Sequence, residues 1–133
     1  MTKYISAYLA TAVVMIVLDL LWLGVIATPL YQQGLGHLMA ERPNLMAAAA
    51  FYVLYVFGLL MFTIVPQAAD ASWLKTAATA AMFGFVAYAT YDLSNLATLR
   101  DWPVWLSLID MTWGAVLSAV AAIAGRFAWD RFA

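Results

Sequence analysis

YISAYLATAVVMIVLDLLWLGVIA, residues 4–27, is the stretch that decides the fold. One charged residue, Asp19, interrupts an apolar run that is long enough to cross a hydrocarbon core of about 30 Å as a helix. The run exceeds the roughly 7–15 apolar residues of a secretory signal and lacks a clear small-residue cleavage site. We therefore expect it to persist as a membrane-spanning helix that carries a carboxyl group.

Three further apolar stretches have the same character, and Pro, Gly or charged residues separate each from the next. Asp101 is placed to cap the last helix. The sequence therefore predicts an all-α membrane protein in which four transmembrane helices form one bundle. Residues 1–133 would make a single domain, with spans at about 4–27, 45–65, 72–98 and 102–127.

The composition supports this class of protein and excludes others. Hydrophobic residues make up 67% and charged residues 10% of the chain, whereas a soluble domain has roughly 45–50% and about 25%. The net charge of -1 and the scattered bases rule out a nucleic-acid-binding surface. Cysteine is absent, so thiol chemistry and thiolate metal sites are excluded.

Basic residues set the expected orientation. With four spans the two termini share one side, which carries more bases than the other, so the positive-inside rule places both termini in the cytoplasm. The bases on the terminal side are Lys3, Lys75, Arg126 and Arg131, and those on the other side are Arg42 and Arg100. Residues 29–42 are too polar to span. We expect a short interfacial helix there, a lid over the bundle, with an apolar stripe of Leu30, Tyr31, Leu35, Leu38 and Met39.

Three aspartates are expected to lie at nearly the same depth. At the helical rise of about 1.5 Å per residue, Asp19 lies roughly 12 Å below the outer end of its span, and Asp92 and Asp110 roughly 10 Å below theirs. A carboxylate near the bilayer centre is unfavourable by about 2.5–3.5 kcal/mol, so three at one depth predict a functional site. The short link between the last two spans makes them neighbours, so Asp92 and Asp110 are expected to face each other.

Polar and aromatic residues accompany each aspartate. Asp19 and Asp110 each begin an Asp-x-x-Trp sequence, a weak hint of internal duplication. Tyr88 and Asn95 lie on the same helical face as Asp92. The candidate proton-, cation- or ligand-binding residues are Asp19, Asp92, Asp110, Asn95, Tyr88, Tyr91, Trp22 and Trp113. Arg100 is a candidate ion-pair partner, and we interpret the aromatic-rich stretch 45–65 as scaffold or an apolar wall.

Two or three carboxyl groups in one apolar site repel each other and are poorly solvated, so at least one is expected to hold a proton. Such a group can carry a proton, hold a cation or act as a general acid. We assign no metal site, although oxygen ligands from Asp19, Asp92, Asp110 and Asn95 would suit a divalent cation. The cofactor, if one exists, is unknown. Haem is disfavoured because His37 is the only histidine.

Three motifs resemble one known family. They are Tyr91-Asp92-Leu93-Ser94-Asn95-Leu96-Ala97-Thr98-Leu99-Arg100-Asp101-Trp102-Pro103, Asp19-Leu20-Leu21-Trp22-Leu23-Gly24 and Asp110-Met111-Thr112-Trp113-Gly114. Together they resemble the bacterial membrane-protein family DUF2177 over nearly the whole chain. The resemblance implies a small four-helix protein of the inner membrane and no particular activity. Its motifs coincide with the aspartate layer.

The leading functional hypothesis is proton- or cation-linked binding or transport of a small or lipid-like ligand, in a polar site that opens toward the outer half of the bilayer. A transporter this small would be expected to form a homodimer. One alternative is a membrane enzyme that acts on a lipid or isoprenoid through an aspartate general acid. Another is a structural or accessory subunit of a membrane complex, which predicts satisfied aspartates and no cavity.

Overall fold

The computed structural model describes residues 1–133, and every regular element in it is a helix. The chain begins with α1 (Thr2–Leu21), a π-helical turn (Trp22–Ile26), α2 (Thr28–Leu35) and a short 3₁₀ turn (Gly36–Leu38). It continues with α3 (Leu45–Leu59), a second π-helical turn (Leu60–Ile64), α4 (Trp73–Thr98) and α5 (Val104–Phe132). The all-α prediction is confirmed.

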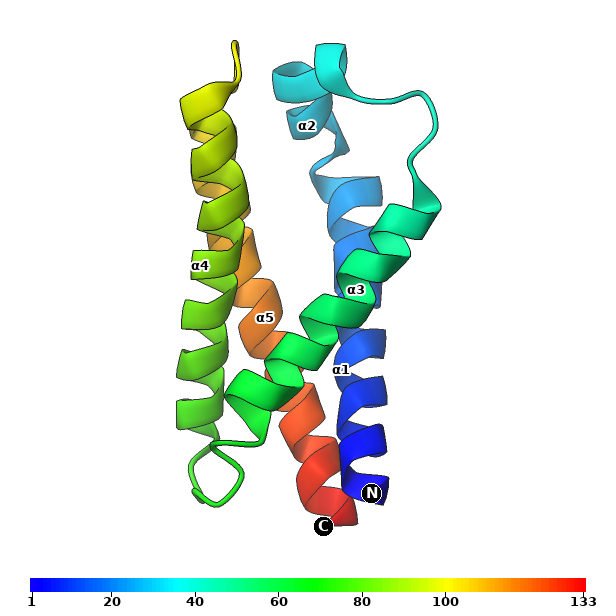
Figure 1. Cartoon of the computed structure of the whole chain (residues 1–133), viewed down its shortest axis with the longest axis vertical. Helices are drawn as coiled ribbons and strands as arrows, with labels where there is room; N and C mark the ends of the chain where they lie inside the picture. The colour runs from blue at the N-terminus through cyan, green and yellow to red at the C-terminus, as the bar shows by residue number, and fades with distance from the viewer.

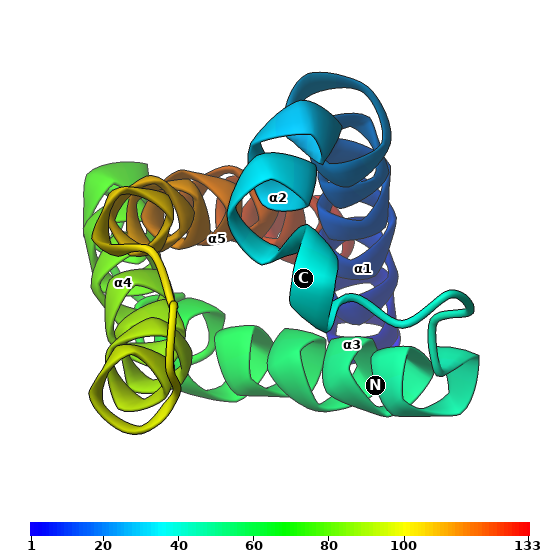
Figure 2. The same cartoon turned by 90° about the horizontal axis from the view of Figure 1, so that it is seen from above.

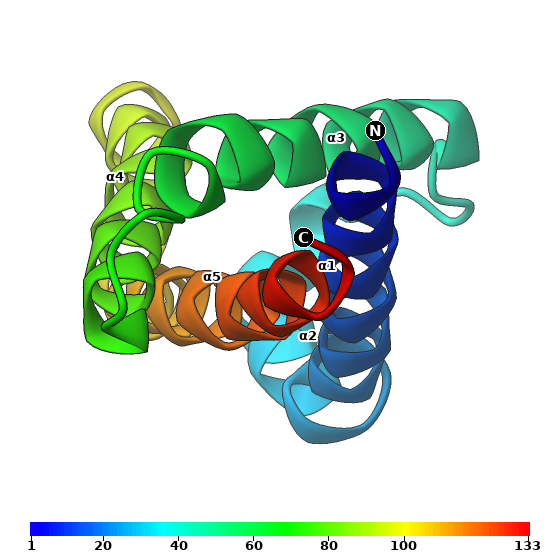
Figure 3. The same cartoon turned by 90° about the horizontal axis from the view of Figure 1, so that it is seen from below.

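The four long helices are arranged around the bundle axis in the order α4, α5, α1 and α3 (Figures 2 and 3). α5 packs most extensively against α4 and α1, while α3 crosses the front of the bundle diagonally (Figure 1). The π-helical turn that follows α3 packs against both α4 and α5, and Tyr55 of α3 also reaches these two helices with its side chain. The N- and C-termini lie side by side at one end of the bundle (Figure 1).

Three helical segments are long and apolar enough to cross a membrane: Thr2–Ile26, Leu45–Ile64 and Val104–Phe132. α4 has the length to do so, at 26 residues, but its many polar residues lower its hydropathy. Length and composition therefore support three candidate spans.

Small residues bring α4 and α5 together. A Cβ added at Gly84 would meet the backbone oxygen of Gly114 and the side chain of Ser118, and one added at Gly114 would meet the ring of Tyr88. Close backbone approach at small residues is the usual way in which helices associate in lipid. This contact places Tyr88 of α4 directly against α5, at the level of the aspartates.

The half of the bundle near the termini has a closed core. Met15, Leu59, Ile64 and Leu117 are fully buried there. Arg126 of α5 is also buried, and its guanidinium donates to the backbone oxygens of the turn between α3 and α4. The opposite half is filled less completely and contains the candidate site.

A short helix follows the first long one, as predicted, and α2 lies across the end of the bundle away from the termini (Figure 2). The predicted apolar stripe is only partly correct. Leu35 is buried, but Leu38 and Met39 are about half exposed because the chain leaves the bundle after the 3₁₀ turn.

The predicted cap of the last helix is wrong. Asp101 has a left-handed backbone, with φ 63°, in the tight link between α4 and α5. α5 begins at Val104 after Pro103, without a side-chain cap. The short link uses Asp101 to reverse the chain, a conformation that Asp tolerates better than most residues.

Candidate functional site

Asp19, near the end of α1, is 6% exposed and accepts hydrogen bonds from two other helices. The Trp113 indole of α5 donates to its Oδ1 at 3.2 Å, and the Tyr52 hydroxyl of α3 donates to its Oδ2. A carboxyl group held by donors on both sides is fixed in position. Asp19 therefore joins α1, α3 and α5 at one point.

Asp110, on α5, is 7% exposed and accepts from a residue of the short helix above it. The Tyr31 hydroxyl donates to its Oδ1 at 2.5 Å, and the Trp22 indole donates to the Tyr31 oxygen at 3.3 Å. Tyr31 lies beyond the end of the first candidate span. Burial, and then the hydrogen bond to Asp110, raise the pKa of Tyr31, so its hydroxyl keeps its proton and acts as a donor.

The two tryptophans link these carboxyl groups. Their rings are stacked, with centroids 4.5 Å apart and planes inclined by 8°. Trp22 donates toward the Asp110 side, through Tyr31, and Trp113 donates to Asp19. The two Asp-x-x-Trp sequences therefore interlock on antiparallel helices, with each indole directed toward the other helix's carboxyl group.

Asp92, on α4, differs from the other two aspartates. It is 2% exposed, and its Oδ2 has no hydrogen-bond partner. Asp110 is the acidic group next to it, and the two carboxyl groups interact. Unpartnered buried polar atoms are rare in folded proteins and call for an explanation.

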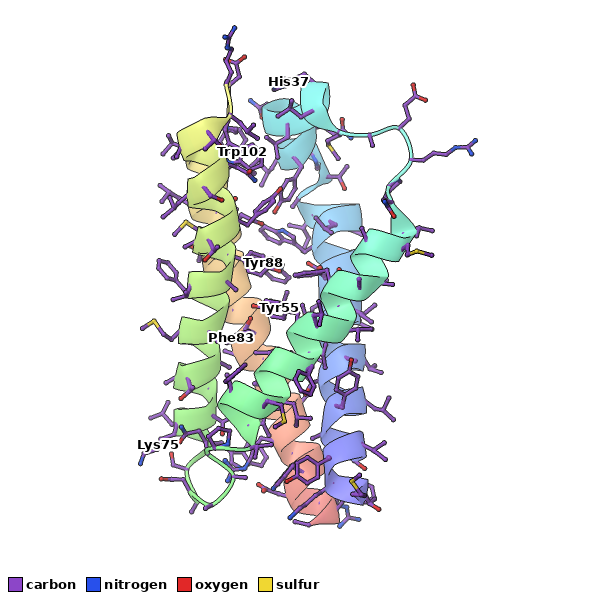
Figure 4. All side chains as sticks on the ribbon, in the orientation of Figure 1. His37, Tyr55, Lys75, Phe83, Tyr88 and Trp102 are labelled. Atoms are coloured by element: carbon purple, nitrogen blue, oxygen red, sulfur yellow. The ribbon has the colours of Figure 1, made fainter.

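A cavity of about 480 Å³ lies between these elements. Its volume is within the range of roughly 300–1,000 Å³ that small-molecule sites occupy. The two carboxyl groups and eight aromatic rings form most of its wall, and no basic side chain lines it. The lining residues are Asp19, Trp22, Leu23, Tyr31, Ala48, Phe51, Tyr52, Tyr55, Ala87, Tyr88, Tyr91, Asp110 and Trp113. In Figure 4, Tyr55 and Tyr88 lie midway along the bundle, between the end marked by His37 and the end marked by Lys75.

The structure brings most of the sequence-predicted residues together. Six of the eight line this cavity, and Asp92 lies behind the wall, next to Asp110. The exception is Asn95, which is partly buried but outside the cavity lining and without a side-chain hydrogen bond. Arg100 is exposed and forms no ion pair with any aspartate.

Three tyrosines have roles that the sequence did not predict. The sequence places Tyr31 in an apolar stripe and predicts that residues 45–65 form scaffold or an apolar wall. In fact Tyr52 donates to Asp19, and the Tyr55 hydroxyl is 2.6 Å from the Ser118 hydroxyl. The signal was present, because a tyrosine hydroxyl in an apolar segment normally finds a partner when it is buried.

The arrangement does not favour the divalent-metal alternative. No group of three or more His, Asp or Glu side chains is placed to hold a metal ion. Asp92 is not part of the cavity lining, and Asp19 and Asp110 are each already held by their own donors, Trp113 with Tyr52 and Tyr31. The chemistry available to the cavity is therefore that of two carboxyl groups surrounded by aromatic rings.

The fold and the site describe an all-helical membrane protein with carboxyl groups facing an aromatic cavity. The chain belongs to the DUF2177 family, described as predicted membrane proteins, whose family model matches residues 4–127. The resemblance that the three motifs indicated is thus confirmed. No curated protein and no solved structure matches the chain.

Proposed function

We propose that this protein binds a small amphipathic organic cation in the central cavity and transports it in exchange for a proton. The observation that carries the proposal is the lining of the cavity, where Asp19 and Asp110 are the only charged groups and the remaining wall is mainly aromatic. A cation near an aromatic face gains roughly 0.5–2 kcal/mol, more when it is desolvated, and a buried carboxylate requires a compensating charge. An anionic ligand would meet only like charge.

Asp92 and Asp110 supply the proton. Two adjacent carboxyl groups in an apolar interior do not both ionise, so the pair holds one proton when the cavity is empty. A cation beside Asp110 stabilises its charged form and expels that proton. The free Oδ2 of Asp92 fits this role, because a group that must gain and lose a proton cannot be tied permanently to a donor.

The proposal places all four long helices across the bacterial inner membrane. α4 packs along α5, which is one of the candidate spans, so α4 shares its apolar surroundings. The short α4–α5 link and the short α3–α4 turn lie at opposite ends of the bundle (Figure 1). The excess of bases at the terminal end favours termini in the cytoplasm. Because one protomer is small for alternating access, we expect a homodimer.

The other two hypotheses make different demands on the site. A purely structural role requires satisfied aspartates and no cavity, so the free oxygen of Asp92 and the 480 Å³ space weigh against it. A membrane enzyme acting on a lipid or isoprenoid remains the second candidate, because the cavity is apolar enough to accept such a chain. An enzyme would convert its ligand into a different compound, whereas a transporter of the proposed kind would release its ligand unchanged.

The test is a calorimetric titration of the protein in phosphatidylcholine nanodiscs with choline and with its uncharged carbon isostere, dimethylbutanol. We expect choline to bind and the isostere not to bind, and mass spectrometry should recover choline intact.

Asp110→Asn should weaken choline binding by about 10–100-fold, which corresponds to the roughly 1.5–3 kcal/mol of a hydrogen bond or contact to a charged group. Asp101→Asn, in the exposed link, is the matched control and should bind choline normally. Equal binding of the isostere, or unchanged binding by Asp110→Asn, would refute the proposal.

A further inference from the structure

A second hollow lies on the outer face of the bundle, beside the cavity. This groove has a volume of about 380 Å³ and runs between the end of α1 and the middle of α5. Its lining residues are Trp22, Leu108, Ile109, Thr112, Trp113 and Val116. Apart from the two indoles, Thr112 is the one polar side chain in this lining. Its hydroxyl donates to the Leu108 backbone oxygen at 2.8 Å. The groove therefore offers hydrocarbon contact and no free hydroxyl donor.

The groove and the cavity share a wall. Trp22 and Trp113 are the two residues that line both spaces, so the stacked indoles separate them. Each ring forms a hydrogen bond on the cavity side, to Tyr31 or to Asp19. No other side chain belongs to both linings.

The backbone beside this wall is loosely packed. Trp22 begins the π-helical turn Trp22–Ile26, in which no residue is buried. A Cβ added at Gly24 would meet nothing within 4 Å. π-helical turns often mark functional sites in helices, and here the turn has room to move without disturbing a packed core.

From these observations we infer that the ligand carries a hydrocarbon tail, which passes between Trp22 and Trp113 and lies in the outer groove while its cationic head occupies the cavity. The inference rests on the proposed function and specifies its ligand class, a single-chain lipid-like amine. Asp19 accepts the hydrogen bond of Trp113, and Asp110 accepts that of Tyr31, which itself accepts from Trp22. The cationic head group competes with these donors for the two carboxyl groups. Binding of the head therefore loosens the wall that the tail must pass.

The test is photolabelling with a choline-type ammonium that carries a dodecyl chain with a terminal diazirine. The intact protein is labelled in phosphatidylcholine nanodiscs, and the adducts are mapped by mass spectrometry. We expect adducts on Leu108, Thr112 and Val116, which choline at about ten times its Kd should reduce about tenfold. Val120 is also exposed on α5 but lines neither space, so any label it receives comes from bulk lipid and should resist choline.

A matched pair of variants gives a second measure. Val116→Trp fills the groove and should weaken binding of the dodecyl probe about tenfold while choline still binds, whereas Val120→Trp should affect neither. The inference would be overturned if the adducts were confined to α3 and α4, or if choline did not reduce the label at Val116. Neither result would contradict the binding of choline in the cavity. Failure of the wild-type protein to bind choline would instead refute the proposed function, and the inference with it. If a bilayer acyl chain or a second protomer filled the groove instead, the probe would not label the groove residues, and this result would also overturn the inference.

Discussion

Asp92 is the residue whose surroundings are least expected. Its side chain is 2% exposed, one carboxyl oxygen has no partner, and the adjacent group is another carboxyl, Asp110. Burial of an unsatisfied polar atom is unfavourable by about 1–3 kcal/mol, so stability alone does not account for an acid at this position. The proton exchange proposed above would account for it.

We expect Asp92→Asn to fold and to be more stable than the wild type by about 1 kcal/mol, because the amide is neutral without having to hold a proton and its NH₂ group can donate a hydrogen bond to Asp110. In this variant Asp110 ionises without a competing acid, so choline should bind without releasing a proton. Thermal unfolding measures the first effect. Titrations in two buffers of different ionisation enthalpy measure the second.

The wild-type protein should release up to one proton on binding, and its affinity for choline should fall as the pH is lowered, since protons compete for the same carboxyl pair. Asp101→Asn serves as the control for both measurements. A loss of stability in Asp92→Asn, or undiminished proton release, would contradict the role given to this residue.

At the scale of elements, the contact between α4 and α5 depends on glycine. A Cβ at Gly114 would clash with the ring of Tyr88, which in turn lines the cavity. Gly114→Ala should therefore reduce the free energy of unfolding by about 1–3 kcal/mol and weaken choline binding, because Tyr88 must move. Gly24→Ala meets open space and should change stability by less than about 1 kcal/mol. Equal thermal stabilities of the two variants would show that the helices do not pack as described.

Arg126 holds the turn between α3 and α4. Its guanidinium donates to the backbone oxygens of Gln67 and Ala68 and to the Thr76 hydroxyl, and it forms an ion pair with Asp130 at 3.2 Å. Sequence analysis counted Arg126 only as an orientation signal. Its burial on a helix face was not visible from the composition of the segment.

Replacing Arg126 by Leu should reduce the free energy of unfolding by about 3–5 kcal/mol, because several buried oxygens lose their donor. Arg131→Leu, on the exposed end of the same helix, is the matched control and should have little effect. Chemical unfolding in detergent measures both variants. A mild effect of Arg126→Leu would mean that water replaces the guanidinium.

The same turn contains an ion pair between Asp70 and Lys75, with a separation of 2.8 Å. The hydrogen bond from Lys75, followed by that from the Ser72 amide, holds the pKa of Asp70 below its usual range. A depressed carboxyl pKa contributes stability at neutral pH that is lost as the pH falls through that value. Because the pair is exposed, its contribution is small.

At the scale of the whole molecule, the open question of span number has a direct test. The chain has no cysteine, so single cysteines can be introduced and labelled with a membrane-impermeant maleimide. With four spans, cysteines at Ala71 and Ala133 should be protected in intact cells, and those at Glu41 and Arg100 should be labelled. If α4 does not cross the membrane, Ala71 and Arg100 will instead be labelled from the same side.

The one-dimensional pattern of the chain was sufficient to predict the helices. Long apolar runs can satisfy their backbone groups in lipid only as helices, so residues 4–27, 45–65 and 102–127 needed no tertiary information. A constant rise per residue likewise predicted that the aspartates lie at one depth. Asp19 and Asp110 do line one cavity, and Asp92 lies next to Asp110.

Which groups meet at that depth was decided only by the tertiary structure. The diagonal course of α3 brings Tyr52 to Asp19, the turn into α2 brings Tyr31 to Asp110, and the antiparallel contact of α1 with α5 stacks the two tryptophans. Helical periodicity determines which residues share a face. It does not determine the rotation of each helix about its axis or its crossing angle, and these follow from close packing at residues such as Gly84 and Gly114, on separate helices.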